Sequence, residues 1–209
     1  MGFFDSLPKP EPPPRPRYRA HPPWISPGNN IMPATLAVDG VLVRTPTLGV
    51  YVDGFRVFPY GFAFGVTVLI NVAAGEEPTR DPFAMHPDSH QHGISPADRA
   101  NALRIGVQYP DGSGAMVGGP GRTGDWSQPP EPPVISIGGA SGGGGSWEQG
   151  LWVWNVPESG DVSLVYSWLA RSVPESRLTL DGEALRAAAA RAVVLWPEPT
   201  DEEDGDVAK

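Results

Sequence analysis

Apolar and polar residues alternate along several short segments of this chain, a pattern typical of β-strands with one buried face. The clearest case is residues 162–168, where Val162, Leu164, Tyr166 and Trp168 occupy every second position. Residues 62–70 are a run of aromatic and β-branched side chains, which predicts a central strand. Other strands are predicted at residues 35–38, 41–43, 49–52, 55–58, 103–109, 115–117, 134–137, 147–154 and 177–180.

Asp-Gly pairs punctuate these strands at residues 39–40, 53–54 and 111–112. An Asp-Gly pair between apolar runs is a strong hairpin signal, because both residues tolerate a positive φ. We therefore expect the first strand to be interrupted or turned at residues 39–40. A hairpin is expected at residues 53–54 and a turn at residues 111–112.

One helix is predicted after the last strand. Asp181 suits the N-cap position, and residues 184–193 are strong helix formers that Pro197 brings to an end. Helical spacing places several apolar residues on one face, which we expect to cover a sheet: Leu185, Ala188, Ala189, Ala192 and Trp196.

Short strands separated by turns and followed by one helix predict a mainly β fold, an antiparallel β-sandwich or open barrel with one C-terminal helix. We place this domain at residues 34–196. Residues 1–33 are predicted to be a proline-rich disordered or extended tail, and residues 197–209 an acidic disordered tail. The proline-rich stretch suits either a tether or a ligand for the groove of another protein.

Composition excludes several kinds of chemistry. The chain has no cysteine, so disulfides, thiolate catalysis and cysteine zinc sites are absent. A net charge of −9 argues against a general nucleic-acid binder. There is no stretch of about 18 apolar residues that would span a membrane, and the first residues do not resemble a signal peptide. We therefore predict a cytoplasmic protein.

Two glycine motifs match known site patterns by letter only. Residues 119–124 fit the dinucleotide pattern G-x-G-x-x-G, and residues 139–143 fit the nucleophile pattern G-x-S-x-G. Both patterns need a helix directly after the glycines, and neither is followed by a helix-forming sequence. We expect no catalytic residue and no cofactor from either motif.

A cluster of histidines could bind a metal ion. His86, His90 and His92 lie within residues 73–101, a polar segment that we interpret as a long surface loop. Imidazoles two and four residues apart can converge on zinc or a similar ion. The alternative is a solvated loop with no metal.

Two tryptophans could bind a partner. Trp152 and Trp154 share one face of a predicted strand, because side chains alternate along a strand. If exposed, they would suit a sugar ligand or an apolar group of a protein partner. If buried, they belong to the core.

Several segments carry a likeness to known proteins: residues 56–64, 103–112, 151–157, 173–176 and 187–196, Trp168, and the glycine run that ends at Ser146-Trp147 before a W-x-W strand. In these segments the sequence resembles a group of small actinobacterial β-rich proteins with no assigned activity. The likeness covers most of residues 34–196, but neither tail nor the histidine segment. The resemblance implies a shared β-rich domain and implies no reaction.

These observations favour a non-enzymatic protein-binding, structural or adaptor module that contacts a protein partner or a second copy of itself. No nucleic acid is expected as a partner. One alternative is a metal-binding protein or metal-dependent enzyme that uses His86, His90 and His92. Another is a carbohydrate-binding module that uses Trp152 and Trp154.

Overall fold

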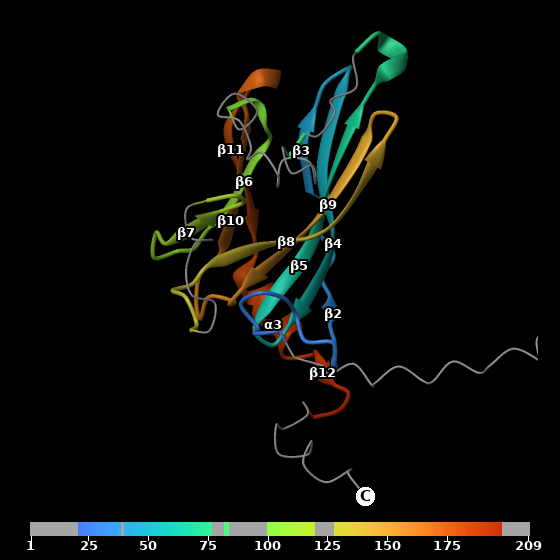
Figure 1. Cartoon of the computed structure of the whole chain (residues 1–209). Helices are drawn as coiled ribbons and strands as arrows, with labels where there is room; N and C mark the ends of the chain where they lie inside the picture. Colours follow the sequence, from blue (N-terminus) through green and yellow to red (C-terminus); the bar gives the residue numbers. More distant parts are fainter. Residues whose placement is uncertain (1–20, 39, 77–81, 84–99, 120–127, 198–209) are drawn as a thin grey trace, which may run out of the picture.

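The computed structural model describes residues 21–38, 40–76, 82–83, 100–119 and 128–197. It is mainly β, with three antiparallel sheets and one short α-helix near the C-terminus (Figure 1). The fold class predicted from the hydrophobic pattern is thus confirmed. The predictions for residues 1–20 and 198–209 lie outside the described residues.

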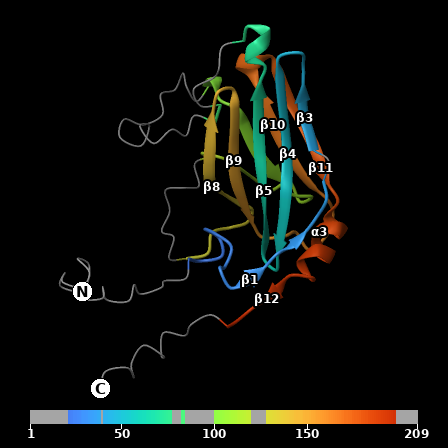
Figure 2. The same ribbon diagram turned by 90° about the vertical axis from the view of Figure 1, so that its right-hand side faces the viewer.

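The larger sheet has six strands. Its order is β2 (Ala34–Thr35), β4 (Leu48–Phe58), β5 (Gly61–Ile70), β9 (Ser146–Trp154) and β8 (Val134–Gly143), and β3 (Gly40–Arg44) also pairs with β4. Figure 2 shows β8 at one side of this sheet and β3 at the other. The long apolar run predicted as a central strand is β5, which pairs with β4 and β9.

The second sheet has four strands in the order β11 (Val173–Leu180), β10 (Val162–Trp168), β6 (Arg104–Gln108) and β7 (Gly114–Met116). A third sheet pairs β1 (Ile31–Met32) with β12 (Val193–Val194) and so joins the two ends of the described chain. Two short 3-10 turns, η2 (Val72–Ala74) and η4 (Leu169–Arg171), follow β5 and β10.

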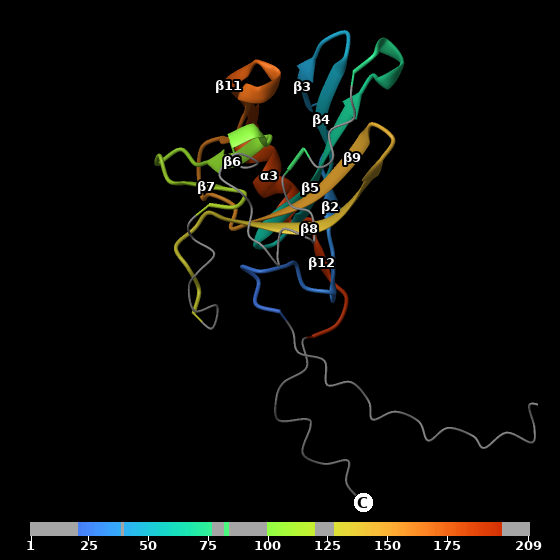
Figure 3. The ribbon, with the colours of Figure 1, turned by 45° about the horizontal axis from the view of Figure 1, so that its top comes forward.

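The two larger sheets form two layers with one core between them (Figure 3). Phe55 and Phe64 of the six-stranded sheet stack with ring centroids 5.0 Å apart. Their cluster includes Leu164 and Trp168 of the four-stranded sheet. The alternation of residues 162–168 is confirmed, because Val162, Leu164, Tyr166 and Trp168 are all buried.

The helix α3 (Gly182–Ala189) closes one end of these layers. As predicted, Asp181 caps it, with its side chain accepting a hydrogen bond of 3.0 Å from the Ala184 amide. Leu185 and Ala188 are fully buried. The predicted extent of the helix is wrong: it ends at Ala189, and Trp196 is 55% exposed. The chain leaves the helix because residues 193–194 pair with β1 instead.

Neither of the first two Asp-Gly pairs forms a hairpin turn. Asp53 and Gly54 form a bulge inside β4 and no hairpin, since Asp53 pairs with Gly65 and Arg56 with Ala63. Gly54 has a φ of +62°, which explains the glycine. At the first Asp-Gly pair, β2 and β3 are separate strands that do not pair with each other, because both pair with β4.

The turn at residues 111–112 is confirmed. The Ser113 amide donates a hydrogen bond of 2.9 Å to Asp111 Oδ1, and Gly112 has a φ of +88°. Hydrogen bonds from Ser113 hold the pKa of the exposed Asp111 carboxyl below its usual range.

The folded part begins earlier than the sequence boundary at residue 34. Residues 21–30 lie against the outer face of the six-stranded sheet, where the Trp152 indole donates to the Pro23 carbonyl oxygen at 2.9 Å. Ile31 and Met32 pair with β12. The sequence predicts a tail here because the segment is rich in proline, and its contacts are with residues far along the chain, from 32 positions away for Gly28 and Tyr60 to 129 for Pro23 and Trp152.

Candidate functional site

The β8 strand exposes one edge of the six-stranded sheet. It pairs with β9 on one side, and no described residue pairs with its other side. Residues 138–143, which we call the glycine edge, are all exposed. An open strand edge carries backbone N–H and C=O groups that can pair with another strand.

The glycine edge lacks the side chains that normally protect an open edge. Its sequence is Gly-Gly-Ala-Ser-Gly-Gly, with no charged residue, no proline and no side chain larger than serine. Edge strands of native proteins usually carry lysine, proline or inward charges that discourage pairing. The edge therefore suits close approach of another backbone.

A bulge at Gly138 and Gly139 shapes the start of this edge. The register shifts between the pairs Ile137–Leu151 and Ala140–Gln149. The Gln149 side chain, 1% exposed, donates from Nε2 to the carbonyl oxygens of Gly138 and Gly139 at 3.2 and 3.4 Å. Gln149 thus fixes the bulge from inside and leaves the outer edge open.

Trp147 lies directly across the second half of the edge. It pairs with Gly142, and a Cβ atom at Gly142 would lie 2.3 Å from the indole ring. The indole therefore packs where a side chain at residue 142 would be. Its buried Nε1 has no hydrogen-bond partner among the described residues. Glycine at residue 142 is explained by this packing.

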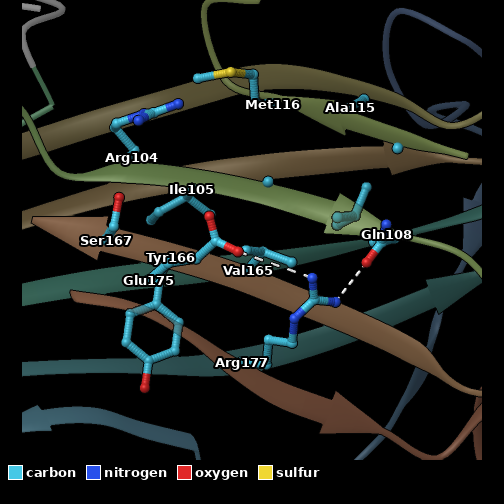
Figure 4. A pocket seen from close by; sticks show the side chains of 13 residues that line it. Arg104, Ile105, Gln108, Ala115, Met116, Val165, Tyr166, Ser167, Glu175 and Arg177 are labelled. Atoms are coloured by element: carbon cyan, nitrogen blue, oxygen red, sulfur yellow. Dashed lines mark hydrogen bonds and ion pairs between the residues drawn. The ribbon is translucent and has the colours of Figure 1, made fainter. Parts of the chain in front are cut away.

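A hollow of about 300 Å³ lies on the outer face of the four-stranded sheet (Figure 4). Three of its polar side chains contact one another, since Arg177 donates to the Gln108 side-chain oxygen and its Nη2 lies 3.9 Å from Glu175 Oε1. Residue 106 at the bottom of the hollow is glycine because a Cβ there would lie 2.7 Å from the Ala115 carbonyl oxygen. With Arg177 engaged by its neighbours, this hollow points to no particular ligand.

Tyr109 has the most strongly shifted pKa among the described residues, and the shift argues against a role for this tyrosine as a base. Burial first, and the nearby Asp111 carboxylate second, raise the pKa of its hydroxyl. The hydroxyl donates to the Asn155 backbone carbonyl oxygen. A tyrosine in this state stays protonated at neutral pH, so it is a structural donor and not a base.

The two tryptophans predicted as a partner-binding pair are not both exposed in the structure. Trp152 is 3% exposed and packs edge-on against Phe58, with ring centroids 5.4 Å apart. Trp154 is half-buried and meets Trp24 edge-on at 5.9 Å. Both face residues 21–31 and form a small second cluster outside the main core. The exposure that carbohydrate binding requires is therefore missing at Trp152.

The predicted metal ligands His86, His90 and His92 lie outside the described residues. Within the part of the chain that the structure describes, no three histidine, aspartate or glutamate side chains are grouped to hold a metal ion. That part also contains no helix with the length and apolar character needed to cross a bilayer.

The sequence pattern did not predict the glycine edge as part of a strand, because glycine is depleted in strands. One signal was present: Gly144 and Gly145 have positive φ and connect β8 to β9, and a Gly-Gly pair is a hairpin turn sequence. Reading that pair as the turn extends the strand back through residue 138.

We compared the chain with protein families, with curated proteins and with solved structures, and found no match to any of them.

Proposed function

We propose that this chain is a non-enzymatic protein-binding module that takes an extended segment of a protein partner onto the β8 edge. The observation that carries the proposal is the exposed, unpaired and uncharged glycine edge, residues 138–143. Strand addition uses backbone hydrogen bonds for affinity, which an open edge supplies without further side chains.

The glycines also indicate what kind of segment fits. The six residues carry almost no side chains of their own, so apart from Gly142, where the Trp147 indole packs, little side chain covers the backbone of this part of β8. A partner strand with large aromatic or β-branched residues would cover that backbone and bury its own apolar area. We therefore expect a partner segment rich in such residues, in extended conformation.

The test is a partner pull-down with variants that block only the edge. Gly139 has open space around its Cβ position and Ser141 is exposed, so Gly139→Lys with Ser141→Lys should fold normally. Lysine on an edge discourages strand pairing. Leu69→Lys is the matched control, because Leu69 is 43% exposed on the central strand β5, which pairs on both sides.

The tagged full chain and both variants would be purified from a lysate of the native host, and bound proteins quantified by mass spectrometry. We expect a partner that binds the natural chain and Leu69→Lys but is lost from the double lysine variant. Hydrogen exchange of the purified complex should then show slowed amides in residues 138–143. A partner retained equally by all three proteins, or no partner at all, would refute the proposal.

A further inference from the structure

The ends of the described chain meet in an apolar ribbon. Figure 3 shows the first and last described segments, blue and red, close together at one end of the sandwich. There β1 and β12 pair, with Ile31 opposite Val194 and Met32 opposite Val193. Five side chains of this terminal ribbon and the residues after it are 44–58% exposed: Met32, Val193, Val194, Leu195 and Trp196.

These five are half of the ten large apolar side chains that are exposed in the described part of the chain. Since strand side chains alternate, they lie on both faces of the ribbon. Contiguous exposed apolar surface usually marks a contact site. A two-stranded ribbon alone is also only marginally stable in water, so a covering segment would stabilise it.

The ribbon is nevertheless held in a defined position. The Leu195 amide donates to the Asn30 carbonyl oxygen at 2.8 Å, and Asn30 Nδ2 donates to the Trp196 carbonyl oxygen at 2.9 Å. Asn30 itself is only 8% exposed. Trp196 is thus presented by fixed backbone contacts and does not belong to a fraying end.

We infer that the terminal ribbon is covered by the chain's own N-terminal residues Phe3, Phe4 and Leu7. These three are the apolar group at the start of the sequence, and the structure does not describe them. Two phenylalanines and a leucine offer the apolar area that the exposed valines, leucine and tryptophan require.

Charge supports the same pairing. Between Leu7 and the described domain lie four basic residues, Lys9, Arg15, Arg17 and Arg19, and one acidic residue, Glu11. Six acidic residues follow Trp196 before Lys209: Glu198, Asp201, Glu202, Glu203, Asp204 and Asp206. The apolar N-terminal group is therefore followed by a basic stretch, and the apolar ribbon by an acidic one. Opposite charges beside the contact favour the encounter, and salt weakens it.

The connecting chain is long enough. Residues 7 to 21 span at most about 50 Å when extended. A folded domain of this size has a radius of gyration of about 15 Å, so the N-terminal group can return to the ribbon of its own chain. A tether of this length gives an effective concentration of roughly millimolar, which favours contact within one chain over contact between chains.

The absence of cysteine makes a direct test clean. In the full chain, Ser6→Cys takes a single nitroxide label beside the apolar group. The seven tryptophans are replaced by 5-fluorotryptophan, and the Trp196 fluorine signal is assigned with Trp196→Phe. We expect the label at residue 6 to broaden the Trp196 signal more than any other, and reduction of the nitroxide to restore it.

Two controls separate contact from general proximity. With Phe3→Ser, Phe4→Ser and Leu7→Ser added to the labelled chain, the broadening should disappear. A label at Ala170→Cys, an exposed residue of η4, should broaden Trp168 and leave Trp196 sharp. Equal broadening of Trp196 by the serine variant would overturn the inference, as would no broadening of Trp196 from residue 6.

A mixed sample shows whether the N-terminal group contacts the ribbon of its own chain or that of a second copy. Chains labelled at residue 6 but free of fluorine are mixed with unlabelled fluorinated chains. We expect no broadening of Trp196 in this mixture. Broadening there would overturn the arrangement within one chain and assign the contact to a second copy.

Discussion

The indole Nε1 of Trp152 donates a hydrogen bond of 2.9 Å to the backbone carbonyl oxygen of Pro23. This contact ties the middle of β9 to a segment 129 residues earlier in the chain. The ring also packs edge-on against Phe58 and Tyr60, with centroids 5.4 and 6.1 Å away. Trp152 thus helps to attach residues 21–30 to the outer face of the large sheet, together with Trp154, which meets Trp24, and Tyr60, whose hydroxyl accepts a hydrogen bond from the Gly28 amide.

Replacing Trp152 should therefore loosen this segment. We expect Trp152→Phe to lower the free energy of unfolding by about 1–3 kcal/mol, because the hydrogen bond is lost and a cavity remains. Hydrogen exchange should accelerate mainly in residues 21–30. Trp154→Phe is the matched control, because Trp154 is less buried than Trp152. A larger loss of unfolding free energy in Trp154→Phe than in Trp152→Phe would contradict the prediction.

Tyr109 should make stability sensitive to alkaline pH. Its pKa is raised in the folded protein above the unfolded value of about 10, so the folded state holds the proton more tightly. The contribution of Tyr109 to stability is therefore fully present and independent of pH below about pH 10, and it falls as pH rises further, because the unfolded tyrosine ionises first.

Tyr109→Phe tests this directly. At pH 7 it should lower the free energy of unfolding by about 1 kcal/mol through the lost hydrogen bond to the Asn155 carbonyl. Urea unfolding between pH 7 and 11 should show a smaller alkaline loss for the variant than for the natural chain. Parallel curves would show that Tyr109 is not the group responsible.

The N-cap of α3 offers a graded test of the helix. Asp181→Ala should destabilise the protein by about 1 kcal/mol, because the Ala184 amide loses its acceptor. Asp181→Asn keeps an acceptor and should be close to the natural chain. Leu185→Ala should lose about 2–5 kcal/mol, since Leu185 is fully buried. Urea unfolding measures all three, and an equal loss for Asp181→Asn and Asp181→Ala would argue against the cap.

Two glycines of the β8 edge should respond differently to alanine. At Gly142 a Cβ would lie 2.3 Å from the Trp147 ring, so Gly142→Ala should destabilise by about 1–3 kcal/mol and change the Trp147 fluorine signal. At Gly139 the Cβ meets open space, and Gly139→Ala should be neutral or slightly stabilising. Similar effects at both positions would contradict the packing of Trp147 on the edge.

Much of the fold followed from local patterns. The alternation of Val162, Leu164, Tyr166 and Trp168 predicted a strand with one buried face, and Asp181 predicted the start of the helix. These predictions held because period-two burial and N-capping depend on residues within a few positions of one another. The turn at Asp111-Gly112 held for the same reason.

The candidate site was not predictable in this way. Asp53-Gly54 looks like a hairpin turn but lies in a bulge, because the neighbouring β5 pairs with both halves of β4. The glycine run became a strand because β9 supplies its hydrogen bonds and Gln149 completes its bulge. Trp152 became buried because residues 21–30 return to cover it.

The sequence by itself determined the strands that carry alternating or continuous apolar residues, where the helix begins and that the protein is mainly β, since these depend on side-chain periodicity and local hydrogen bonds. Only the tertiary structure decided which strand is left with an open edge, which tryptophan is covered and that the two ends of the described chain meet in one ribbon. Those features depend on partners far apart in sequence, and short-range patterns do not record which distant segments pair.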